Sequence, residues 1–208
     1  MNTEEVNFIQ GTLQTLNKAI NFKDADTQEM ETNMESVRNH LLSVMQSRLM
    51  NDNGDAIIGA FLKGKPIVYL KRLIQWRKAG NFDLDDKNRH ISMVYRWLIA
   101  SFVNITCVET GCEYYLNNEG IKYTCFELKS NSFLEKLDIS KNESLTLTIA
   151  GFLLTIINNI SRIEGFKLKL TEELQKQNFI EVLMLYIDSL YAVINLCPLE
   201  NCKNKRFK

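Results

Sequence analysis

Apolar residues recur at every third or fourth position along most of this chain, which is the period of a helix that buries one face. The pattern runs through the segments 4–20, 27–50 and 66–76, and Pro66 fits the first turn of the last of these. Only two prolines and nine glycines occur among the 208 residues, so the turns that a multi-stranded sheet requires are scarce. The sequence therefore predicts an all-α fold.

Three later segments are more apolar than the first three, and each carries apolar residues on more than one helical face. They cover residues 94–105, 149–160 and 180–194. A helix that is apolar on several faces is covered on several sides. We therefore expect these three segments to form an inner layer, with the less apolar helices on its flanks.

Domain boundaries are weakly marked, because no low-complexity linker interrupts the chain. We interpret residues 1–52 as an N-terminal helical pair that packs on the core, 53–202 as a helical-repeat-like core, and 203–208 as a basic tail. The tail, which reads KNKRFK, is too short to carry a core of its own.

Two of the apolar segments end in the same way. Each reaches an Asn–Ile pair, continues to a Glu five residues after the Asn, and then meets a Gly, as the stretches WLIASFVNITCVETGCEYYL and FLLTIINNISRIEGFKLKL show. These corners contain Asn104 with Gly111 and Asn159 with Gly165, and a third helix ends at Asn195. Asn tolerates the left-handed conformation and its amide can bond the backbone of the turn, while Gly permits a sharp reversal. We therefore expect a repeated helix-to-helix corner.

The corners resemble the armadillo-repeat family, whose long third helix ends in an L-x-N-L element and whose next helix opens on E-x-G-x. The resemblance covers roughly residues 66–197. It implies a short stack of armadillo/HEAT-like helices, a fold that usually binds another protein along a groove. A compact helical bundle is the alternative architecture.

One family feature is missing. Armadillo proteins that bind extended basic peptides carry a Trp four residues before the corner Asn, and here those positions hold Ala100, Thr155 and Tyr191. Only Tyr191, four residues before Asn195, places an aromatic ring at the position of the family's Trp. The resemblance therefore favours a folded surface, or a helix laid in a groove, as the partner.

Positive charge gathers in one segment, KGKPIVYLKRLIQWRKAGN, although the whole chain is neutral, with 25 Lys and Arg against 25 Asp and Glu. The neutral balance disfavours nucleic acid as a partner. We expect Lys71, Arg72, Arg77 and Lys78 to form a cationic rim that meets an acidic protein surface; a plain solvated helix face is the alternative. The residues predicted to bind a partner are Lys71, Arg72, Arg77, Lys78, Asn104, Asn159, Tyr191 and Asn195.

The sequence contains no phosphate-binding loop, dinucleotide fingerprint, zinc-protease motif or nucleophile elbow. The two histidines, His40 and His90, fit surface roles. Five cysteines without an export signal indicate reduced thiols, and their spacing lacks a complete set of zinc ligands. We expect no catalytic residue, no metal and no cofactor.

The sequence predicts a non-enzymatic protein-protein interaction module, a scaffold or adaptor located inside the cell, in the cytoplasm or nucleus. The longest apolar segment falls short of the roughly 20 residues that span a bilayer, so no membrane contact is expected. The alternative is a compact Bcl-2-like bundle of viral type, which binds a partner helix and modulates host signalling.

Overall fold

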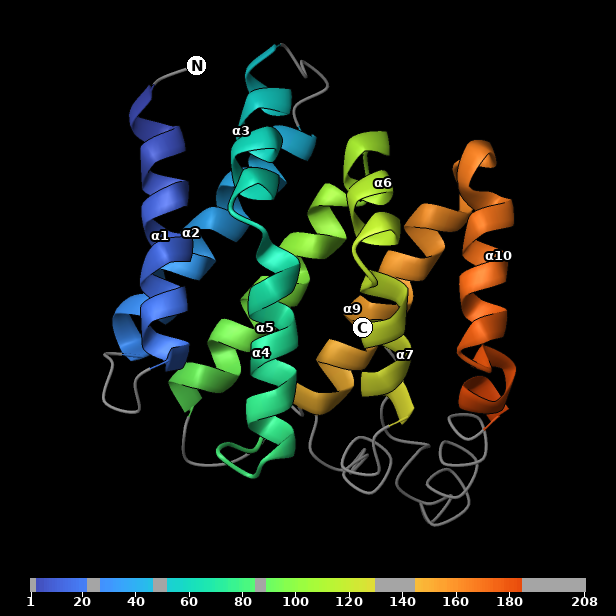
Figure 1. The fold of residues 1–208 in the computed structure, drawn as a ribbon. Coiled ribbons are helices and arrows are strands. Elements are labelled where there is room, and N and C mark those ends of the chain that lie inside the picture. The colour runs from blue at the N-terminus through green and yellow to red at the C-terminus, as the bar shows by residue number, and fades with distance from the viewer. Residues whose placement is uncertain (1–2, 22–26, 47–51, 85–88, 130–144, 185–208) are drawn as a thin grey trace, which may run out of the picture.

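The computed structural model describes residues 3–21, 27–46, 52–84, 89–129 and 145–184 (Figure 1). All regular structure within these ranges is helical, which confirms the predicted all-α fold. The elements are α1 (Thr3–Asn21), α2 (Thr27–Gln46), α3 (Asp52–Lys63), α4 (Pro66–Lys78), α5 (Arg89–Ile105), α6 (Glu109–Asn117), α7 (Gly120–Lys129), α9 (Leu145–Ser161), the 3-10 turn η1 (Glu164–Phe166) and α10 (Lys167–Lys176). The chain is helical again over 179–184.

Local sequence signals explain several of the helix ends. Pro66 occupies the first turn of α4, as predicted, because its fixed φ suits that position and its missing N–H has no helical partner there. After α4, Gly80 adopts a φ of 77°, a left-handed conformation that favours glycine. Helix α3 was not predicted, because its polar start and its internal Gly59 are typical of a loop.

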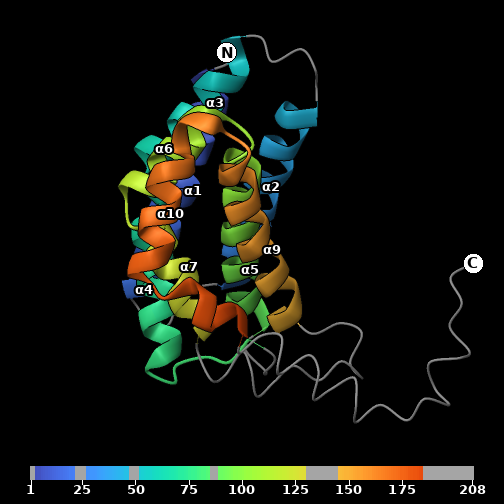
Figure 2. The same ribbon diagram turned by 90° about the vertical axis from the view of Figure 1, so that its right-hand side faces the viewer.

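The helices form two layers (Figure 2). Layer B consists of α2, α5 and α9, which lie side by side with α5 in the middle. Layer A consists of α1, α3, α4, α6, α7 and α10, which cover one face of layer B. The order of elements therefore repeats, since α3 and α4 in layer A lead to α5 in layer B, and α6 and α7 lead to α9.

The N-terminal pair is divided between the layers. Helix α1 packs on α3 and α4 in layer A, while α2 packs on α5 in layer B. One cluster of buried apolar side chains runs from Ile9 in α1 to Val182, so the hydrophobic core continues without a break across residue 52.

Aromatic rings connect the two layers inside this core. Phe102 of α5 makes edge-to-face contacts with Phe61 of α3 and Tyr115 of α6, at centroid distances of 6.2 and 5.1 Å. The Tyr115 hydroxyl lies 2.8 Å from Thr124 Oγ1, which satisfies its buried polar group. These contacts hold the middle of the stack together.

The predicted inner layer is only partly correct. Helix α5 is covered on several sides, and Ile99 is fully buried there as expected. Helix α9 packs on α5 and leaves Leu154 36% exposed. In the third segment, only residues 180–184 are described, and Ile180 is 78% exposed.

Several predicted features lie outside the described residues. These are Tyr191, Asn195, the last two cysteines (Cys197 and Cys202), and the basic tail 203–208. Within the part of the chain that the structure describes, no helix is both long and apolar enough to span a membrane.

Candidate interaction surfaces

The corner asparagines bond the neighbouring helix of layer B. Asn104 Nδ2 in α5 donates to the Arg38 carbonyl of α2 at 3.1 Å. Asn159 Nδ2 in α9 donates to the Val103 carbonyl at 3.1 Å and to Thr106 Oγ1 at 3.3 Å. The expectation that each amide bonds its own turn is therefore wrong, because the same donor group fastens one layer B helix to the previous one.

The corner glycines also differ from expectation. Gly111 lies in the first turn of α6, where an added Cβ atom would sit 1.8 Å from the Ile105 carbonyl oxygen. An added Cβ at Gly165 meets nothing within 4 Å. Neither residue adopts a left-handed φ, so the predicted role in a sharp reversal is wrong. Gly111 is needed for the close approach of α6 to the end of α5.

The Arg77 side chain is buried, which corrects its assignment to a cationic rim. It is 8% exposed, and Nη2 donates to both carboxylate oxygens of Glu127 in α7, at 2.7 and 2.8 Å. Burial raises the pKa of Glu127, whereas the charge of Arg77 and its hydrogen bonds lower it. Burial and the neighbouring Glu127 charge also raise the pKa of Tyr95. This ion pair joins α4 to α7 inside the stack.

The other predicted rim residues are divided between two roles. Arg72 is half-buried and donates through Nη1 to Asn17 Oδ1 of α1, so it ties α4 to its neighbour. Lys71 and Lys78 are exposed. Lys78 Nζ lies 4.9 Å from the centroid of the Phe126 ring in α7, within cation–π range. Of the four predicted cations, Lys71 and Lys78 face solvent.

A mixed apolar and cationic surface remains on layer A, which we call the α4–α7 patch. It consists of Val68, Lys71, Lys78 and Phe126. Val68, Lys71 and Lys78 follow the helical period along the exposed side of α4, and α7 packs beside α4 (Figure 1). Val68 and Phe126 are 39% and 38% exposed. The patch therefore combines two exposed apolar side chains with two ammonium groups.

A second basic site lies at the seam between α2 and α5. The Trp97 ring is 7% exposed, and two guanidinium groups lie against it. The Cζ atom of Arg38 is 4.8 Å from the ring centroid, and that of Arg96 is 4.7 Å. The apolar pattern of residues 94–105 predicts an inner helix and singles out neither arginine. The only available signal was Arg96 beside Trp97, because Arg38 comes from another helix.

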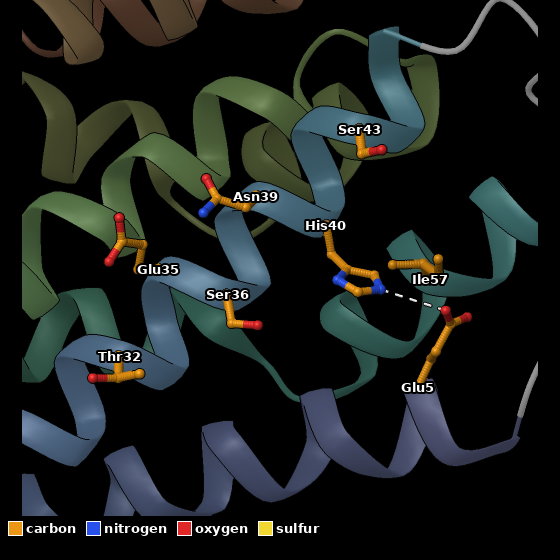
Figure 3. A pocket seen from close by; sticks show the side chains of 8 residues that line it. All are labelled: Glu5, Thr32, Glu35, Ser36, Asn39, His40, Ser43 and Ile57. Carbon is orange, nitrogen blue, oxygen red and sulfur yellow. Dashed lines mark hydrogen bonds and ion pairs between the residues drawn. The ribbon is translucent and has the colours of Figure 1, made fainter.

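A polar pocket of about 610 Å³ opens where α1, α2 and α3 meet (Figure 3). Most of its lining comes from α2, including Glu35, and Ile57 of α3 is its one apolar member. His40 Nε2 lies 3.4 Å from Glu5 Oε1 across the pocket, and both side chains are exposed. Such an open pair is typical of a solvated surface.

The second histidine and the thiols have structural partners. His90 Nδ1 in α5 lies 2.5 Å from Glu31 Oε2 in α2, which adds a polar contact within layer B. Cys112 is buried, its Sγ donates to the Thr106 carbonyl at 3.0 Å, and burial raises its pKa to about 12. Cys107 is exposed. In the described ranges, no three His, Cys, Asp or Glu residues are grouped to hold a metal ion.

Within the described residues, the geometry thus offers basic surfaces on opposite layers and the polar pocket lined mainly by α2. The chain was compared with protein-family models, curated proteins and solved structures. None of the three comparisons found a match. The functional argument therefore depends on the residues and contacts described above.

Proposed function

We propose that this protein is a non-enzymatic interaction module, a scaffold or adaptor that binds an acidic protein partner through the α4–α7 patch. The observation that carries the proposal is the juxtaposition of Phe126 and Lys78, an exposed aromatic ring with an ammonium group over it. Exposed aromatic and aliphatic groups supply binding energy when a partner excludes water from them. Flanking lysines orient an acidic partner and increase its association rate.

The layered order of helices supports an armadillo-like scaffold over a Bcl-2-like bundle. After α2, pairs of short layer A helices (α3 with α4, and α6 with α7) alternate with the longer helices α5 and α9 of layer B. The corner asparagines connect successive layer B helices. Stacked units of this kind build extended surfaces on which a folded partner or a helix can lie.

A non-enzymatic role is supported by the state of the candidate catalytic groups. Burial raises the pKa values of Cys112 and Cys125 to about 12, which keeps both thiols protonated and poorly nucleophilic. The imidazoles of His40 and His90 pair with glutamates at partly exposed sites, with no nucleophile among the hydrogen-bond partners described for either ring.

A photo-crosslinking experiment tests the patch. A photoreactive amino acid replaces Phe126, and in a control it replaces Leu168 of α10, whose side chain is 74% exposed. We expect a discrete crosslinked partner from position 126 that is absent from position 168. Its yield should fall as salt concentration rises, because the lysines contribute long-range attraction.

Charge reversal supplies the second half of the test. Lys71→Glu with Lys78→Glu should abolish the crosslink and leave thermal stability nearly unchanged, because both side chains are exposed. Lys167→Glu with Lys176→Glu makes the same change of charge on α10 and should leave the crosslink intact. Equal crosslinking by both double variants would rule out the patch.

A further inference from the structure

We propose that Arg38, Arg96 and Trp97 form a binding site for a carboxylate group on an acidic peptide segment of a partner protein. The three residues are called the Trp97 site below. The inference shares one assumption with the proposed function, namely that the partner is a protein. It places a second contact on layer B, whereas the α4–α7 patch lies on layer A (Figure 2).

The first argument is uncompensated charge. Two guanidinium groups lie 4.8 and 4.7 Å from the centroid of one indole ring. Among the residues that the structure describes, no carboxylate lies within ion-pair distance of Arg38 or Arg96. The partners of their Nη1 atoms are neutral, namely Asn39 Oδ1 at 2.7 Å and Met93 Sδ at 3.9 Å. An anion bound at these guanidinium groups would offset the positive charge that the two arginines place around the ring.

The second argument is unsatisfied hydrogen-bond donors. Arg96 Nε and Trp97 Nε1 are both buried atoms without a hydrogen-bond acceptor in the structure. A buried donor without an acceptor costs free energy, and native proteins contain few such donors. The Trp97 ring is more than nine-tenths buried, so its position is set by packing. An ionised carboxylate, which only accepts hydrogen bonds, is the kind of group that these donors lack, and the half-buried side chains of Arg38 and Arg96 are the part of the site that it can reach from solvent.

The third argument is rigidity. Arg38 belongs to α2, whereas Arg96 and Trp97 belong to α5, so the site exists only where these two helices pack. Asn104 Nδ2 donates to the Arg38 carbonyl and fixes the backbone of α2 against α5 at that residue. Asn104 is therefore a positioning residue for the Trp97 site. Preorganised arginines lose less freedom on binding than free surface arginines do.

A carboxylate suits the site better than a nucleic acid backbone does. Nucleic acids require a series of cations along the phosphates, and this site has two. Acidic side chains are also close by on α2, since Glu31 and Glu35 precede Arg38 by two turns and one turn. Glu35 lines the separate pocket in Figure 3, and Glu31 pairs with His90. These acids would repel a long polyanion more than a short acidic segment.

Fluorescence titration provides the direct test. Trp76→Phe leaves Trp97 as the one remaining tryptophan, because the chain contains two. The probe is an acetylated and amidated peptide with an Asp-Glu-Asp segment between Gly-Ser flanks. The control peptide carries Asn-Gln-Asn instead. We expect the acidic peptide to change the Trp97 emission saturably, with an affinity at least about tenfold above that of the neutral peptide, because charged hydrogen bonds contribute that factor or more.

Variants locate the binding on the protein. Arg38→Gln and Arg96→Gln should each weaken peptide binding by about tenfold, and by more together. Arg162→Gln, an exposed arginine just beyond α9, should leave the affinity unchanged. Lys71→Glu with Lys78→Glu should also leave it unchanged, which separates this site from the α4–α7 patch. Thermal unfolding verifies that each variant is folded. If the double variant Arg38→Gln with Arg96→Gln does not fold, the two single variants provide the test.

Four results would overturn the inference. The first is equal affinity for the acidic and neutral peptides. The second is undiminished binding by the folded Arg38→Gln and Arg96→Gln variants. The third is tighter binding of oligothymidylate or inorganic phosphate than of the acidic peptide, which would assign the site to a phosphate group. Loss of peptide binding on reversal of Lys71 and Lys78 alone would support the proposed function and reject the Trp97 site.

Discussion

Replacing Arg77 by Met removes one partner of a buried ion pair and leaves the Glu127 carboxylate without its cation. The Glu127 side chain is fully buried, and the N–O distances are 2.7 and 2.8 Å. At an effective dielectric constant of about 20, charges about 4 Å apart attract by about 4 kcal/mol. Breaking a buried pair costs about 3–5 kcal/mol by experience with other proteins. We therefore expect Arg77→Met to lower the free energy of unfolding by about 3–5 kcal/mol near neutral pH.

The loss should depend on pH in a defined direction. Burial raises the pKa of Glu127 in the folded protein, and the variant lacks the Arg77 charge that lowers it. The folded variant then holds a proton that the unfolded chain, with a pKa of about 4.3, has released. Its stability is greatest below the unfolded pKa and falls as pH rises through the folded pKa. The difference from the unmodified protein should therefore shrink as the pH is lowered toward about 5.

Urea unfolding followed by circular dichroism measures both effects. A matched control is Lys122→Met, which removes the exposed Lys122–Glu119 pair of 2.8 Å and should leave the free energy of unfolding nearly unchanged. The double replacement Arg77→Met with Glu127→Leu should recover most of the loss, because well-packed apolar residues can replace a buried pair. A loss below about 1 kcal/mol, or one that is the same at both pH values, would refute the reasoning.

Three further substitutions test the packing. Gly111→Ala should lower the free energy of unfolding by about 1–3 kcal/mol, because the added methyl group meets the Ile105 carbonyl oxygen. In the same urea assay, the control Gly165→Ala should change it by less than about 0.5 kcal/mol, because the added methyl group meets no atom within 4 Å. Equal effects of the two substitutions would contradict the close approach of α6 to the end of α5. Trp97→Ala should cost about 3–5 kcal/mol because the ring is buried, and a fully stable variant would undercut its position in α5. Asn159→Ala should cost about 1–2 kcal/mol through its lost bonds to α5, against a near-neutral Asn158→Ala, and equal thermal midpoints would argue against the corner bonds.

Much of the secondary structure could be predicted, because its signals are local. The helical period located α1, α2, α4, α5 and α9, and the corner pattern located the start of α6 at Glu109. Helix α3 was not predicted, because its glycine and polar residues are a local signal for a loop. Burial of Ile57, Ile58 and Phe61 against other helices stabilises it. Tertiary packing outweighed local propensity there.

The candidate surfaces could be predicted only in part. Lys71 and Lys78 are exposed on α4 as expected, but Arg77 lies on the same helix and its side chain is buried. The helical period gives a residue's direction around its own axis and carries no information about which neighbour covers that side. The acid that pairs with Arg77 comes from α7, beyond two intervening helices in the chain. Composition alone could not distinguish this arginine from the two solvated lysines.

The sequence by itself determined the fold class, the boundaries of several helices and the neutral overall charge, since each depends on residues a few positions apart or on a simple count. The tertiary structure alone decided which polar groups meet. Arg77 bonds Glu127 across 50 positions, Asn104 reaches the Arg38 carbonyl across 66, and Asn159 reaches the Val103 carbonyl across 56. Such pairs form because burying the apolar faces brings distant helices together, and an unpaired polar group in the resulting core would cost more than the pairing does.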